Sequence, residues 1–72
     1  MKPGDPIIVL LDGRSHPLLA GTTLAEMVAQ LGHAPAAVAT AINGIFVPRA
    51  QRDERLLANA DAVLLFKPIV GG

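Results

Sequence analysis

Two short turn signals, Asp12-Gly13 and Asn43-Gly44, constrain the fold of this chain more than any other feature. Each pair separates two short runs rich in aliphatic and β-branched residues. Such pairs favour the two-residue turns of β-hairpins, because both turn positions need positive φ angles. The sequence therefore predicts two hairpins, residues 7–11 with 16–19 and residues 38–42 with 45–47. Pro17 lacks a backbone N–H, so its strand should lie at a sheet edge.

One helix is predicted between the two hairpins. With Thr23 as N-cap, Glu26 falls at position N3, and this spacing forms a capping box. An apolar stripe at helical spacing follows: Leu24, Met27, Val28 and Leu31. Gly32 is suited to the left-handed position after a helix end. The helix is short, so packing against the rest of the chain must stabilise it.

The C-terminal part of the chain predicts a last strand and a tail. Residues 49–58 are polar and expected to be irregular, apart from a helical turn, and residues 62–66 are apolar. Strands with one helix on one face give an α+β domain, expected over residues 1–66. Pro68 should end the sheet pairing, so residues 67–72 are predicted to be a flexible C-terminal tail.

Composition excludes several classes of function. The chain has 72 residues, six basic and six acidic side chains, and no cysteine. It should therefore be one small domain without thiol chemistry, and the balanced charge argues against nucleic-acid binding. No apolar run approaches the roughly 20 residues that span a bilayer, so a cytoplasmic protein is expected. His16 and His33 lack metal-ligand spacing, so neither a metal site nor a catalytic residue acting in isolation is predicted.

A single helix can cover only one face of the predicted sheet. In the first strand, Ile8 and Leu10 alternate onto the same face as Asp12, which indicates that they point away from the helix. Leu64 and Phe66 are expected on that same open face. A contiguous apolar patch on a small domain is typical of an interaction surface. The alternative is that loops cover the patch, or that both faces of central strands are simply apolar.

The last residues carry the strongest functional signal. Gly71 and Gly72 have no side chains, so this tail could enter a narrow channel and present its terminal carboxylate. Basic residues are expected to form a patch beside the tail that docks an acidic groove on a partner: Arg49, Arg52, Arg55 and Lys67. An ordinary mixed-charge surface is the alternative.

Several segments resemble the ThiS family of sulfur carriers. Residues 41–49, AINGIFVPR, resemble the A-(I/L)-N-x-x-x-V-P-R segment of that family. Residues 64–66 and 69–72 resemble its C-terminal end, and residues 20–24 resemble the start of its helix. Arg52 stands where the family often has an aromatic residue. Ala60 replaces a usual glycine, so Asn59 is expected to take the left-handed backbone conformation.

The resemblance implies a β-grasp, ubiquitin-like fold with a mixed sheet of about five strands, in which the first and last strands are parallel central neighbours. It also implies a sulfur carrier for the thiazole of thiamine. An E1-like adenylyltransferase would adenylate the Gly72 carboxylate, using ATP and Mg²⁺ that this chain does not itself bind. A sulfur donor such as a cysteine desulfurase would then give a thiocarboxylate, and thiazole synthase would take the sulfur.

Two sets of residues are expected to carry these roles. The tail before the modified Gly72 is formed by Ile69, Val70 and Gly71. The partner-binding surface is expected to comprise Ile8, Leu10, Arg49, Leu64, Phe66 and Lys67. Two alternatives stay open, a MoaD-like small subunit of molybdopterin synthase, which shares the fold, the Gly-Gly end and the chemistry, and a ubiquitin-like binding module with an inert tail.

Overall fold

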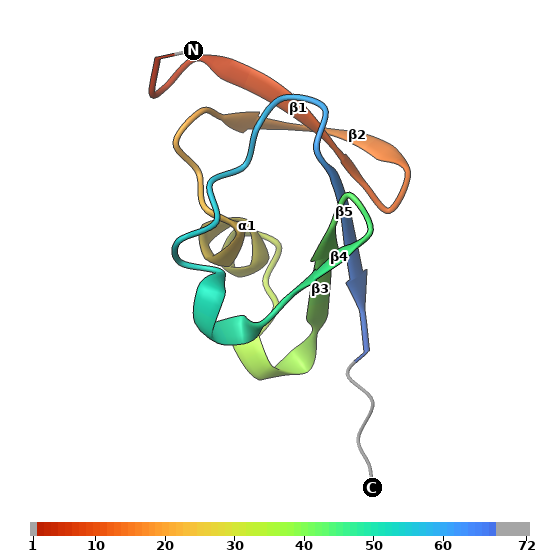
Figure 1. The fold of residues 1–72 in the computed structure, drawn as a ribbon. Helices are drawn as coiled ribbons and strands as arrows, with labels where there is room; N and C mark the ends of the chain where they lie inside the picture. The colour runs from red at the N-terminus through yellow and green to blue at the C-terminus, as the bar shows by residue number, and fades with distance from the viewer. Residues whose placement is uncertain (1, 68–72) are drawn as a thin grey trace, which may run out of the picture.

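The computed structural model describes residues 2–67 of the 72-residue chain (Figure 1). Within that range, the elements in chain order are β1 (Pro6–Leu11), β2 (Arg14–Leu19), α1 (Leu24–Gln30), the 3-10 helix η1 (Pro35–Ala37), β3 (Ala39–Ile42), β4 (Ile45–Val47), the 3-10 helix η2 (Arg49–Gln51) and β5 (Ala62–Phe66). All predicted strands and the predicted helix are therefore present.

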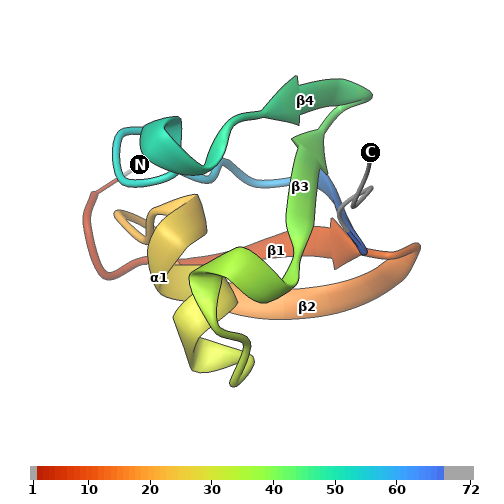
Figure 2. The ribbon, with the colours of Figure 1, turned by 90° about the horizontal axis from the view of Figure 1, so that it is seen from below.

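The strands form one mixed sheet in the order β2-β1-β5-β3-β4. β1 and β5 run parallel, whereas the pairs β1–β2, β3–β4 and β3–β5 are antiparallel. The sheet curves around α1, which lies against one face only (Figure 2). The α+β class and the β-grasp arrangement with β1 and β5 as parallel neighbours are confirmed. β2 is an edge strand, as Pro17 predicted.

Both predicted hairpin turns form as the sequence requires. The φ angles are 49° at Asp12 and 84° at Gly13, and 53° at Asn43 and 82° at Gly44. Two consecutive positive φ angles match the turn whose twist suits a two-residue hairpin. These turns fix the strand registers, pairing Leu11 with Arg14 in one hairpin and Ile42 with Ile45 in the other.

The capping box of α1 is present in full. The Glu26 backbone N–H donates to Thr23 Oγ1 at 3.1 Å, and the Thr23 N–H donates to Glu26 Oε1 at 3.0 Å. Gly32 follows the helix with a φ angle of 85°. Seven residues are too few for an independent helix, so burial of its apolar stripe must hold α1 in place.

The hydrophobic core lies between α1 and the concave face of the sheet. Its buried members are Ile7, Val9, Leu18, Leu24, Met27, Val28, Ile42, Val47, Leu57 and Val63. Every member is aliphatic. Each fully buried aliphatic side chain contributes about 1.5–3 kcal/mol relative to an exposed one, so this cluster is the main source of stability.

The left-handed position before β5 is occupied by Ala60, with a φ angle of 73°, and not by Asn59. The prediction for Asn59 was wrong, because the Asn59 side chain is hydrogen-bonded to β1 and the next residue takes the positive φ angle. Asn59 Oδ1 accepts the Ile8 backbone N–H at 2.9 Å, and the Ala60 N–H donates to Ile8 O at 2.7 Å. Both contacts tie the loop to β1, and the reversal falls one residue later.

Candidate functional site

β5 is the central strand of the sheet and leads directly to the C-terminal tail. β1 pairs with it on one side and β3 on the other, where four residue pairs run from Ile42–Val63 to Ala39–Phe66. Asp12 adds a clamp, because its N–H donates to Val63 O at 2.9 Å and its Oδ1 accepts the Leu65 N–H at 3.2 Å. The point at which the chain leaves the sheet is thus held from both sides.

The predicted tail itself, Ile69, Val70, Gly71 and the modified Gly72, lies outside the described residues. Its roles therefore stay predictions. The same holds for the proposed division of the chain into residues 1–66 and 67–72, although β5 ends at Phe66.

An apolar patch occupies the sheet face opposite α1. Ile8 is 51% exposed, Leu10 40%, Leu64 48% and Phe66 43%. On the other side of these strands, Ile7, Val9 and Val63 are buried in the core. The assignment of strand faces is therefore confirmed, and the described loops do not cover these side chains. Their part in partner binding stays a prediction.

Phe46 extends this surface, and the sequence analysis missed it. Its side chain is 59% exposed, and its strand neighbour Ala41 is paired on the other side with Leu64. Registered residues project from the same face, so Phe46, Ala41 and Leu64 form one row across the sheet. The Asn43-Gly44 turn could have revealed this, since a two-residue turn there pairs Ala41 with Phe46. The open-face patch is hereafter Ile8, Leu10, Phe46, Leu64 and Phe66.

Two of the four residues of the predicted basic patch, Arg52 and Arg55, are bonded to other parts of the domain. Arg52 is only 4% exposed, and its guanidinium donates to Thr40 Oγ1 at 3.1 Å, to Pro35 O at 2.9 Å and to Val38 O at 2.6 Å. Burial lowers the pKa of Arg52 below its ordinary value, and the nearby charge of Arg49 lowers that pKa further.

Arg55 is also engaged within the domain. It lies 3.5 Å from Asp61 Oδ2 and donates to the Leu56 carbonyl. Arg49 and Lys67 are exposed, as expected for a docking surface. The prediction was wrong for Arg52 because neutral carbonyl and hydroxyl acceptors, which sequence patterns do not reveal, can satisfy a buried guanidinium.

The side chains of residues 2–67 show no arrangement typical of a metal centre. No group of three or more His, Cys, Asp or Glu residues within that range is placed to hold a metal ion. His16 lies half-buried in β2, and His33 is exposed after α1. In the same part of the chain, no helix has the length and apolar character needed to cross a bilayer.

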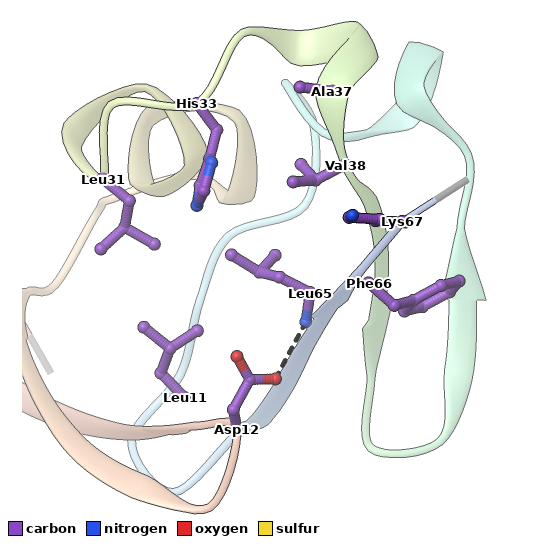
Figure 3. Close-up of a pocket in the computed structure, with 9 residues that line it drawn as sticks. All are labelled: Leu11, Asp12, Leu31, His33, Ala37, Val38, Leu65, Phe66 and Lys67. Atoms are coloured by element: carbon purple, nitrogen blue, oxygen red, sulfur yellow. Dashed lines mark hydrogen bonds between the residues drawn. The ribbon is translucent and has the colours of Figure 1, made fainter.

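A cavity of about 470 Å³ opens beside the end of β5, on the side that faces α1. Figure 3 shows Leu11, Leu31 and Leu65 pointing towards one another within it, whereas Phe66 points away from them. Val38 completes the apolar floor. Asp12, His33 and Lys67 contribute polar groups at the edge, so the cavity combines an apolar interior with titratable side chains.

Comparisons with known proteins agree with this geometry. The sulfur carrier protein ThiS of Escherichia coli K12 is 36% identical over 64 residues, covering 89% of this chain and 97% of that protein. The crystal structure of a thiamine biosynthesis protein, ThiS, from Geobacter metallireducens superposes with a TM-score of 0.74 over 92% of this chain and 100% of the other, at 23% identity, and supports the fold. A family model described as the ThiS family matches residues 9–72. A match that spans nearly the whole chain, together with the β-grasp sheet, shows that this chain belongs to the ThiS family.

Proposed function

We propose that this chain acts as the ThiS-type sulfur carrier of thiamine biosynthesis through the carboxylate of Gly72. The observation that carries the proposal is that the family match runs through residue 72 and so includes the Gly71-Gly72 pair. The match also favours this role over the molybdopterin synthase subunit and over a binding module with an inert tail.

The first chemical step activates the carboxylate. A carboxylate is a poor acyl donor because hydroxide is a bad leaving group. An α-carboxyl group has a pKa near about 3.5, so it is ionised at neutral pH and can attack the α-phosphorus of ATP. The bond from that phosphorus to pyrophosphate breaks, and an acyl adenylate forms. The E1-like adenylyltransferase supplies the ATP site and the Mg²⁺.

The second step replaces AMP by sulfur. A nucleophilic sulfur from a donor such as a cysteine desulfurase attacks the acyl carbon, and AMP leaves with its bonding electrons. Where the donor is a persulfide, a thiol then reduces the remaining S–S bond and releases the thiocarboxylate. Thiazole synthase accepts the sulfur from that group, so this chain is a cosubstrate and not the catalyst.

The described part of the chain provides the surface that these enzymes would bind. The open-face patch offers aromatic and aliphatic side chains on the convex side of β5, and Arg49 and Lys67 add exposed positive charge. Aromatic residues, phenylalanine included, and arginine are enriched at protein–protein interfaces. The central strand therefore links the surface that binds the enzyme to the tail that reacts.

Intact-mass measurement tests the proposal directly. The carrier is incubated with ATP, Mg²⁺, a sulfur donor and its adenylyltransferase, and one carboxylate oxygen should be replaced by sulfur. The matched control is the variant that lacks Gly72. An unchanged mass for the wild-type carrier, under conditions that thiolate another ThiS carrier, would contradict the proposed function.

A further inference from the structure

The cavity beside the end of β5 has no role in the chemistry proposed above. Its floor is formed by Leu11, Leu31, Val38 and Leu65, which pack against the core but stay partly accessible. α1 ends at Gln30, and η1 begins only at Pro35, so the core is left open between them. Its volume of about 470 Å³ lies within the range of about 300–1,000 Å³ typical of pockets that bind ligands.

The cavity lies directly beside the departure point of the tail. Leu65, Phe66 and Lys67 all line it. The Leu65 side chain points into it, whereas the ring of Phe66 points away from the leucines of the floor and also belongs to the open-face patch (Figure 3). This alternation is the ordinary geometry of a strand. An enzyme that encloses the chain beyond Lys67 can therefore reach accessible side chains on both sides of β5. One side offers the open-face patch, and the other offers this cavity.

The edge of the cavity carries two opposite charges, the ammonium of Lys67 and the carboxylate of Asp12. Lys67 forms no ion pair with any residue of the range 2–67, in which the Arg55–Asp61 pair is the one ion pair found. Asp12, on the same edge, already accepts the Leu65 N–H. Within residues 2–67 the ammonium of Lys67 therefore remains available to a carboxylate from another molecule, placed next to an apolar group that fills the interior.

We propose that this cavity receives an apolar side chain of the adenylyltransferase, and that a carboxylate beside that side chain pairs with Lys67. The inference rests on the proposed function and specifies how the partner holds the carrier. A side chain seated in a desolvated pocket typically dominates binding, whereas a charge at the edge mainly accelerates association. The adenylyltransferase would thereby contact both faces of β5 while the tail of the carrier reaches the active site of the enzyme.

Blocking the cavity tests the proposal without removing any core contact. Ala37 is exposed and lines the cavity, so the ring of Ala37→Phe would occupy its mouth. Ala34→Phe is the matched control, since Ala34 is exposed in the same loop but does not line the cavity. In ATP–pyrophosphate exchange, Ala37→Phe should raise the KM for the carrier by about tenfold or more, the size expected for a lost anchor. The kcat should stay near the wild-type value, and Ala34→Phe should behave as wild type.

Charge reversal tests the second half of the proposal. Lys67→Glu should lower the association rate with the enzyme and weaken its dependence on salt concentration. Lys2→Glu changes net charge equally near the N-terminus, far from the end of β5 (Figure 1), and should have little effect. Lys67 is exposed, so this variant should fold even if Ala37→Phe does not.

Each outcome decides the matter. If wild-type carrier is adenylated normally and both Phe variants behave alike, or Lys67→Glu matches Lys2→Glu, the docking proposal is wrong and the proposed function stands. Tighter binding by Ala37→Phe would also overturn the proposal. A wild-type carrier that is never adenylated would instead overturn the proposed function.

Discussion

Arg52 shows how this fold buries a charged side chain. Its Nε–H and two NH groups donate to Thr40 Oγ1, Pro35 O and Val38 O. Thr40 Oγ1 in turn donates to Val47 O at 3.0 Å. The planar guanidinium thus joins η1, β3 and β4, so Arg52 stabilises the interior and is not part of an exposed docking surface.

Ala60 allows a prediction about stability. A residue with a Cβ atom in the left-handed region costs about 1–2 kcal/mol of conformational energy. Glycine avoids this cost, but it loses more chain entropy on folding, so the net gain in stability is smaller. Ala60→Gly should therefore raise the free energy of unfolding by about 0.5–1 kcal/mol, measured by urea denaturation. Asn59→Gly is the control and should destabilise the protein, because it removes the hydrogen bond to the Ile8 N–H. The reverse order would show that Asn59 takes the strained conformation in solution.

Gly72 is the residue on which the chemistry should depend most. Gly72→Ala places a methyl group beside the reacting carboxylate, and a displacement of about 1 Å in an active site can reduce the rate about 100-fold. ATP–pyrophosphate exchange with the adenylyltransferase measures this loss. The melting temperature should not change, since the substitution lies beyond the last residue of β5. Wild-type exchange by the variant would show that the enzyme does not read the shape of the tail.

At the scale of an element, β5 has two faces with separate tasks. Val63 is buried in the core, whereas Leu64 and Phe66 are exposed on the open face. Leu64→Glu should weaken binding to the adenylyltransferase by at least about 2 kcal/mol, as expected for an interface anchor, with little loss of stability. Isothermal titration calorimetry and thermal unfolding separate the two effects.

Leu56 provides the matched control for that prediction. Its side chain is similarly exposed, but it lies in the loop that contacts Thr23 at the start of α1. Leu56→Glu should bind the enzyme as the wild type does. Loss of folding on Leu64→Glu would mean that the assignment of the two faces of β5 is inverted.

The elements that the sequence predicted correctly depend on neighbouring residues. The Asp12-Gly13 and Asn43-Gly44 turns and the Thr23–Glu26 capping box act within four residues, so their signals can be read directly. Burial of Arg52 depends on carbonyls 14 and 17 positions away, and the φ angle of Ala60 depends on a contact with β1. The cavity at the end of β5 is likewise formed by four separate segments of the chain, so no local sequence pattern predicts it.

At the scale of the whole molecule, the N-terminal segment and the end of β5 lie far apart (Figure 1). Residues 2–5 extend the β1–β2 hairpin, because the Gly4 N–H donates to Ala20 O at 2.9 Å and the Ala20 N–H donates to Asp5 O at 2.7 Å. The family match begins only at residue 9. The segment thus contributes to the domain at a distance from the cavity at the end of β5 (Figure 1).

Deletion of residues 1–4 should therefore separate stability from function. The deletion removes the Gly4–Ala20 hydrogen bond and the Lys2–Asp5 contact, which at this exposed site should lower the free energy of unfolding by about 0.5–1.5 kcal/mol. Thiocarboxylate formation, followed by intact mass over time, should proceed at the wild-type rate. Ile7→Ala, which truncates a buried core side chain, should cost about 2–5 kcal/mol and so calibrates the unfolding measurement. A slower reaction by a deletion variant that remains folded would indicate that the N-terminal segment contacts the adenylyltransferase. The enzyme would then have to contact the carrier along its whole length and not only around the end of β5.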